Sequence, residues 1–193
     1  SAETLNASDL RKVQNAAWQS QRDHVAKNST YFQRLWQGKQ PPSDLRDLAE
    51  LPLSDKSGLR LSQAAHPPFG DYLATERRAV NRLHRTSGTT GQAMNLALSR
   101  RDCDVTETVA GRCQAAAGLG PDHTVIHCLN YQMWMGGLTD HMGLERTGAM
   151  VIPFGVGNTE LLIRTILEVG VTAISCTPSY PAVIAKVLAQ SFP

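Results

Sequence analysis

The chain has 193 residues, 41% of them hydrophobic, which suffices for one substantial domain or two small ones with a buried core. Lysine and arginine number 19 against 17 aspartates and glutamates, so the charge excludes both a basic nucleic-acid-binding field and an acidic solvating tail. No window approaches 18 apolar residues and no basic stretch precedes an apolar run. We therefore expect no membrane span and a protein that acts on small molecules.

The four cysteines are spread without a CxxC pair, which is typical of reduced, cytoplasmic usage rather than of a disulfide framework. They are Cys103, Cys113, Cys128 and Cys176.

Residues 1–79 are expected to form a helical and irregular segment that wraps the core. Residues 8–27 combine Ser8 as an N-cap with a loosely amphipathic pattern, and 31–36 predict a second short helix. Between 38 and 70, prolines punctuate short turns, and frequent leucines exclude a free linker.

Residues 80–193 predict alternating strands and helices, apart from the first two strands, which are separated by a loop. Ser99, with Asp102 three positions on, predicts a capping box at the first helix of this series. The expected strands are 79–84, 94–99, 123–130, 149–154 and 171–177, and the expected helices are 100–118, 136–148, 159–170 and 180–190. The fold class is therefore α/β, a mainly parallel sheet covered by helices.

The chain stops directly after the last predicted helix, with no strand to close the series. A parallel sheet cut there exposes an edge, so we expect a second copy of the chain or another partner to cover it.

The segment Arg85–Gln92 reads RTSGTTGQ and combines four hydroxyl side chains with two flexible glycines. Backbone N–H groups in such a turn can form an anion-binding nest, for which phosphate is the natural ligand. The spacing matches neither a Walker A loop nor a GxSxG nucleophile elbow. A plain hairpin turn between the two flanking strands is the alternative.

The string RTSGTTGQA resembles the phosphate-binding loop of the adenylate-forming enzymes, the superfamily of acyl-CoA synthetases. Three further segments narrow the resemblance to the phenylacetate-CoA ligase branch: Leu48–Arg60, Tyr131–Glu160 and Cys176–Ala185. The resemblance implies the N-terminal domain of an adenylate-forming enzyme, truncated at its C-terminal end.

The resemblance implies that a carboxylate attacks the α-phosphate of Mg²⁺-bound ATP and that coenzyme A then displaces AMP from the acyl-adenylate. Hydroxyl and N–H donors beside the β- and γ-phosphates stabilise the charge that develops there. The residues implied in this role are Ser87, Gly88, Thr89, Thr90, Gly91 and Gln92.

The resemblance also implies a pocket for an aromatic, phenylacetate-like acid beyond the ends of two predicted strands, where open α/β sheets bind ligands. Its residues are Tyr131, Trp134, Gly136, Gly137, Pro178, Ser179 and Tyr180. The alternatives are that Trp134 is a core residue and that 177–180 is an ordinary helix cap.

No metal site is predicted from the protein side chains. His123 and His127 share a face of their strand, yet at ~3.3 Å per residue they stand ~13 Å apart, too far to share one zinc ion.

The sequence departs from the family pattern at two points, and both bear on whether this chain is a catalyst by itself. Gln92 replaces the lysine of the family loop and offers an amide instead of a full positive charge. The later family motifs, including the Mg²⁺-binding glutamate and the catalytic lysine, are not among the 193 residues. The main expectation is the N-terminal part of an acid-CoA ligase. The alternative is a non-catalytic or accessory domain that binds a ligand or docks onto a partner.

Overall fold

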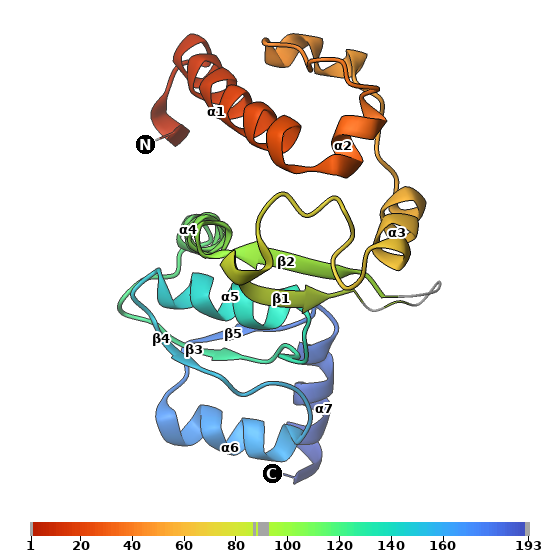
Figure 1. The fold of residues 1–193 in the computed structure, drawn as a ribbon. Coiled ribbons are helices and arrows are strands. Elements are labelled where there is room, and N and C mark those ends of the chain that lie inside the picture. The colour runs from red at the N-terminus through yellow and green to blue at the C-terminus, as the bar shows by residue number, and fades with distance from the viewer. Residues whose placement is uncertain (1, 87, 89–92, 192–193) are drawn as a thin grey trace. The chain divides into compact units, whose positions relative to one another are not determined.

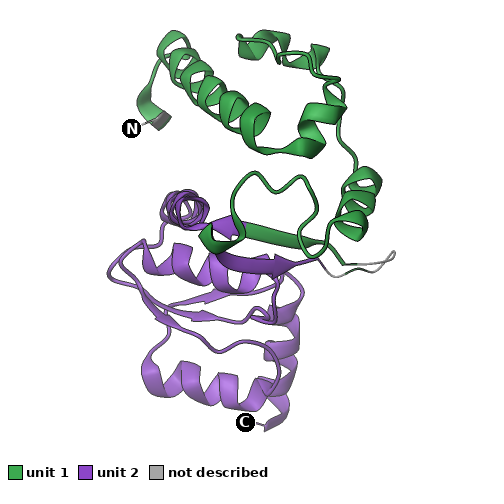
Figure 2. Cartoon of the chain, in the orientation of Figure 1, with its two compact units in different colours: residues 1–80, 88–97 green, residues 81–87, 98–193 purple. Residues whose placement is uncertain are grey.

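The computed structural model describes residues 2–86, 88 and 93–191, and the chain divides into two compact units (Figure 2). The first unit comprises Ser1–Val80 and Gly88–Ala97, and the second comprises Asn81–Ser87 and Leu98–Pro193. The chain thus passes from one unit to the other between 80 and 81, between 87 and 88, and between 97 and 98.

The first unit is helical. Its elements are η1 (Ala2–Thr4), α1 (Ala7–Asn28), α2 (Thr30–Leu35), η2 (Leu45–Glu50), α3 (Lys56–Ala65) and η3 (Arg77–Ala79) (Figure 1). The predicted N-cap of the first helix is wrong: the cap is Asn6, whose side chain accepts a hydrogen bond of 2.9 Å from the Asp9 amide. The Asn6 side chain also donates to the Asp9 carboxylate, so this pair begins the helix two residues before Ser8.

Helix α3 corrects the expectation of only short turns between 38 and 70. Asp55 caps it by accepting a 2.6 Å hydrogen bond from the Gly58 amide. Pro52 and Pro67 lie outside the helix, so its interior keeps every backbone donor. The prolines of this segment therefore mark its boundaries and do not prevent a helix.

A partly buried carboxylate ties the helices of the first unit together. Asp71 accepts a 2.6 Å hydrogen bond from the Ser62 hydroxyl in α3 and forms an ion pair with Arg34 in α2. Further along, the Trp18 indole of α1 donates to the Pro42 carbonyl at 3.0 Å. These bonds fix the proline-rich connections to the helices.

Every predicted strand and helix from residue 79 onward is present, and every strand except the first is shorter than predicted. The elements are β1 (Val80–Arg85), β2 (Asn95–Ser99), α4 (Arg100–Ala116), β3 (Thr124–His127), α5 (Met135–Glu145), β4 (Met150–Ile152), α6 (Thr159–Val169), β5 (Ala173–Ser175) and α7 (Tyr180–Ser191). The capping box is confirmed, since the Ser99 hydroxyl accepts from the Asp102 amide while the Asp102 carboxylate accepts from the Ser99 amide.

A three-stranded parallel sheet lies at the centre of the second unit, in the order β4-β3-β5. Val125 of β3 pairs in register with Val151 on one side and with Ala173 on the other. Strands β1 and β2 lie outside this sheet. The α/β class with a parallel sheet is confirmed.

The two faces of β3 bury two separate apolar clusters. Val125 packs with Leu144 of α5 on one face, and Ile126 packs with Leu162 of α6 and Ile184 of α7 on the other. This arrangement follows from the two-residue period of a strand, which sends neighbouring side chains to opposite faces. The strand is therefore buried on both sides, as a central parallel strand must be.

Across the described ranges, which omit 87, 89–92 and both chain ends, no helix is long and apolar enough to cross a bilayer.

Candidate functional site

The glycine-rich loop begins at Arg85, whose amide donates a 2.8 Å hydrogen bond to the Met133 carbonyl in the second unit. After the loop, Ala93 and Asn95 form hydrogen bonds with Gln63 of α3 in the first unit. There the Gln63 amide group donates to the Ala93 carbonyl at 3.1 Å and accepts from the Asn95 amide at 2.7 Å. Gly88 has a φ of +67°, a left-handed conformation that favours glycine.

The remaining predicted phosphate-binding residues lie outside the described residues, and their role stays a prediction. They are Ser87, Thr89, Thr90, Gly91 and Gln92.

Tyr131 follows the carboxyl end of β3 and is half-buried. Its hydroxyl lies 3.0 Å from Nδ1 of His141 in α5, and Nε2 of His141 lies 3.2 Å from a Glu145 carboxylate oxygen. Burial raises the pKa of Tyr131 to about 12, so the phenol stays protonated at neutral pH. The structure therefore holds Tyr131 by a chain of polar contacts along one face of α5.

His127, at the end of β3, is fully buried and bridges α5 to β5. Its Nε2 lies 2.9 Å from the Gly137 carbonyl, and its Nδ1 lies 3.0 Å from the Ser175 hydroxyl. Because the carbonyl only accepts, Nε2 carries the proton and Nδ1 accepts from Ser175. Burial lowers the pKa of His127 and favours this neutral form.

The start of α5 approaches the strand end closely because Gly137 has no side chain. A Cβ built on Gly137 would lie 2.1 Å from the Asn130 carbonyl oxygen, whereas one on Gly136 would meet the Trp134 ring at 2.8 Å. Trp134 itself is 45% exposed, so the alternative of a core tryptophan is wrong. The structure brings four predicted pocket residues together here: Tyr131, Trp134, Gly136 and Gly137.

The loop after β4 borders the side chain of Tyr131. Gly155 has a φ of +79°, its amide donates to the His127 carbonyl at 3.0 Å, and a Cβ there would contact the Tyr131 ring at 3.8 Å. The carboxyl ends of all three parallel strands thus converge around His127 and Tyr131. This is the sheet edge at which open α/β folds place their ligands.

The segment 178–180 has a different environment. Pro178 and Ser179 are exposed, while Tyr180 packs against the apolar cluster around Ile126 and its hydroxyl lies 3.1 Å from the Thr159 hydroxyl. The structure thus does not show these residues beside Tyr131, and their pocket role stays a prediction.

Within the part of the chain that the structure describes, no three His, Cys, Asp or Glu side chains gather in a way that could hold a metal ion.

Curated relatives match this chain over nearly its whole length. Phenylacetate-coenzyme A ligase of Thermus thermophilus is 34% identical over 194 residues, 98% of this chain and 42% of the relative. The Escherichia coli K12 protein of the same name is 31% identical over 182 residues, 92% of this chain and 40% of the relative. The chain belongs to the phenylacetate-coenzyme A ligase branch of the adenylate-forming enzymes. No family model matches the chain.

A solved structure of another acyl-CoA ligase has the same fold as this chain. A crystal structure of 2-hydroxyisobutyryl-CoA ligase in complex with 2-HIB-AMP and CoA aligns with a TM-score of 0.89 and 28% identity. The alignment covers 97% of this chain and 41% of that one. The chain therefore spans about two fifths of the ligases that it matches, and corresponds to their N-terminal part.

Sequence reasoning missed three histidines that contact the segment of the predicted pocket residues. His84, His127 and His141 all bond to the segment that carries the predicted pocket residues or to its helix. The available signal was position: His84 directly precedes the RTSGTTGQ segment and His127 ends a strand. Sequence reasoning considered His127 for metal ligation alone and so made no functional prediction from it, whereas the structure gives it a carbonyl and a hydroxyl partner.

Proposed function

We propose that this chain is the substrate-binding N-terminal part of an ATP-dependent ligase. The ligase activates an aromatic, phenylacetate-like acid as an acyl-adenylate and transfers it to coenzyme A. The convergence of the three parallel strand ends on Tyr131 carries the proposal, because it offers an aromatic ring and closely approaching glycines at one sheet edge. The relatives are named phenylacetate-coenzyme A ligases, and a structural neighbour is described with an acyl-AMP and CoA.

In this proposal the two parts of the site divide the work. The acid lies against Tyr131 and Trp134, with its carboxylate near the amides at the start of α5 around Gly136. The hydroxyl, N–H and amide groups of 87–92 hold the β- and γ-phosphates and stabilise the leaving pyrophosphate. Mg²⁺ would neutralise phosphate charge during the transfer, and the described residues supply no three-ligand group for it.

Gln92 favours a second candidate, a domain that binds an acid or a nucleotide without chemistry. An amide at this position contributes no net charge to phosphate binding, whereas the family lysine does. The two candidates differ in whether the complete protein exchanges pyrophosphate into ATP when an acid is present.

The test is ATP–pyrophosphate exchange by the full-length protein with phenylacetate as the acid. We expect exchange that depends on the acid and falls at least a hundredfold when Ser87 and Thr90 are both changed to Ala, because two donors to the leaving phosphates are lost. Exchange that is absent in the unchanged protein would favour the non-catalytic candidate.

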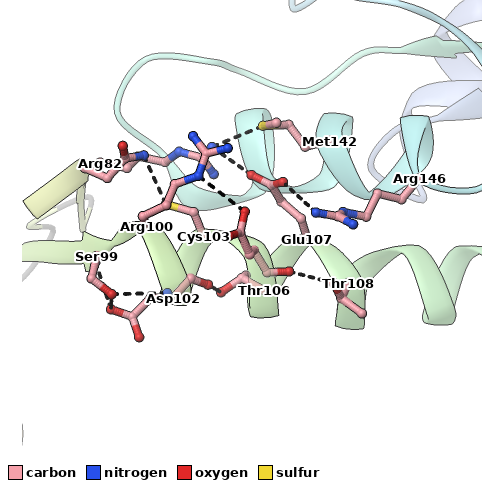
Figure 3. A network of polar contacts seen from close by, with 12 residues as sticks. Arg82, Ser99, Arg100, Asp102, Cys103, Thr106, Glu107, Thr108, Met142 and Arg146 are labelled. Atoms are coloured by element: carbon pink, nitrogen blue, oxygen red, sulfur yellow. Dashed lines mark hydrogen bonds and ion pairs between the residues drawn. The ribbon is translucent and has the colours of Figure 1, made fainter.

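The matched control removes two other threonine hydroxyls. Thr106 and Thr108 of α4 donate only to carbonyls of their own helix, those of Asp102 and Asp104, each at 2.6 Å (Figure 3). The Thr106→Ala, Thr108→Ala variant should exchange pyrophosphate at the unchanged rate. A loss in this control equal to that in the loop variant would remove the loop from the mechanism.

A further inference from the structure

The inner face of β1 is polar, which is unusual for a strand that borders a core. Arg82 and His84 face inward and alternate with exposed residues. Nη2 of Arg82 lies 3.1 Å from Sδ of Met142 in α5, and Nδ1 of His84 lies 3.3 Å from the Met133 carbonyl oxygen just before α5. Both inward side chains therefore contact the helix that begins at the candidate acid pocket, or the residues leading into it.

The Met133 carbonyl receives two donors from neighbouring residues of β1. The Arg85 amide donates to it at 2.8 Å, and His84 donates through Nδ1 because a carbonyl oxygen can only accept. Nε2 of His84 consequently carries a lone pair, and it is buried with no hydrogen-bond partner among the described residues. His84 is 2% exposed, and burial lowers its pKa, so the neutral ring persists at physiological pH.

Met133 has a φ of +54°, a conformation that non-glycine residues seldom adopt and that costs on the order of 1 kcal/mol. Its side chain is 52% exposed, so side-chain packing does not account for this conformation. Two hydrogen bonds to its carbonyl hold the residue in this conformation. They fix the direction of the chain between Tyr131 and the first turn of α5.

We propose that His84 is a positioning residue that fastens the acid-pocket segment 131–137 to β1, through the Met133 carbonyl. The inference rests on the proposed function and names a residue that sets the geometry of its acid subsite. Met133 lies between Tyr131 and Trp134 in the chain, so its carbonyl fixes the direction of the segment against which the acid lies. Productive attack requires the reacting atoms to lie about 3–3.5 Å apart, and a loosened segment misplaces the acid.

The test compares three variants of the full-length protein in acid-dependent ATP–pyrophosphate exchange, with phenylacetate and ATP varied in turn. His84→Leu removes both ring nitrogens, His84→Asn keeps a donor near the place of Nδ1, and His84→Gln places its amide near Nε2. We expect the KM for the acid to rise about tenfold in the Leu and Gln variants, the usual effect of one lost hydrogen bond, while the KM for ATP stays within about twofold. The Asn variant should stay within about twofold of the unchanged protein.

Leu144→Ala is the control for loss of stability alone, because Leu144 is fully buried in the cluster between β3 and α5. It should lower the melting temperature and leave both KM values unchanged. Hydrogen exchange gives a readout that needs no activity: amides in 131–135 should exchange faster in His84→Leu than in Leu144→Ala.

An unchanged KM for the acid in His84→Leu, an equal rise in the KM for ATP, or rescue by Gln in place of Asn would each overturn the positioning role. In those cases the unchanged protein still exchanges pyrophosphate and the proposed function stands. Absence of exchange in the unchanged protein defeats the proposed function, and the positioning role with it.

Discussion

Gly136 and Gly137 are neighbours in the first turn of α5, yet only Gly137 leaves no space for a side chain. Its missing Cβ would stand 2.1 Å from a backbone oxygen of Asn130 and 2.8 Å from the Tyr131 Cα. Backbone atoms cannot move aside without shifting the strand end. At Gly136 the obstacle is the exposed ring of Trp134, which can turn into solvent.

We therefore expect Gly137→Ala to lower the free energy of unfolding by about 2–3 kcal/mol or more, as overpacking against fixed atoms does. Gly136→Ala should change it by less than about 1 kcal/mol, because alanine favours the helix while the Trp134 ring is displaced. Urea unfolding of both variants measures the difference. Equal losses in the two variants would show that the clash with Asn130 is relieved at little cost.

The carboxylate of Glu107 in α4 lies between two arginines from different elements (Figure 3). It lies 2.8 Å from Arg82 of β1 and 3.5 Å from Arg146 at the end of α5. Glu107 and Arg82 keep only 7% and 13% of their side-chain surface exposed. These three side chains therefore join α4 to the end of α5 and to β1, the strand that leads into the glycine-rich loop.

Glu107→Ala should cost about 3–5 kcal/mol of unfolding free energy, because it leaves the Arg82 charge buried without its partner. Asp104→Ala in the same helix breaks only the exposed pair with Arg100 and should cost less than about 1 kcal/mol. Thermal and urea unfolding of the two variants test the contrast. A small loss for Glu107→Ala would mean that water reaches Arg82 readily.

The stability of each compact unit depends on groups that titrate in acid, histidines in the second unit and an aspartate in the first. In the second unit, burial lowers the pKa of both His84 and His127, so these rings stay neutral when the chain is folded. In the first unit, the hydrogen bond from Arg34 lowers the pKa of Asp71, which stays ionised in the fold. Both shifts stabilise the fold above the ordinary pKa of the group, and this stability is lost on acidification.

The pH ranges differ, since the ordinary pKa is 6.5 for histidine and 3.8 for aspartate. Between pH 7 and pH 5 the second unit should lose stability, by at most ~1.4 kcal/mol per pH unit for each buried histidine. The bonds of Asp71 should persist there. Hydrogen exchange at pH 7 and pH 5, corrected for intrinsic rates, should show weakened protection in 98–191 and little change in 7–73.

His84→Asn should reduce this pH dependence, since asparagine does not titrate. Asp140 acts in the opposite sense, because burial raises its pKa and acid relieves its charge. Loss of protection that begins in the first unit would contradict the assignment.

The sequence by itself determined the order of elements after residue 79, the capping box at Ser99 and the family, because strand period, helix caps and loop motifs are local properties of the chain. It misplaced the cap of α1 and overlooked α3. The choice between competing caps, and whether a helix forms between prolines, depend on how the segment packs.

The tertiary structure alone decided the surroundings of the site. Tyr131 and His141 are ten residues apart, and His127 lies 48 residues from Ser175, so no local pattern predicts their contacts. The shared Met133 carbonyl likewise exists only because β1 packs beside the start of α5. Hydrogen bonds between distant segments depend on packing, and packing is settled by the whole core.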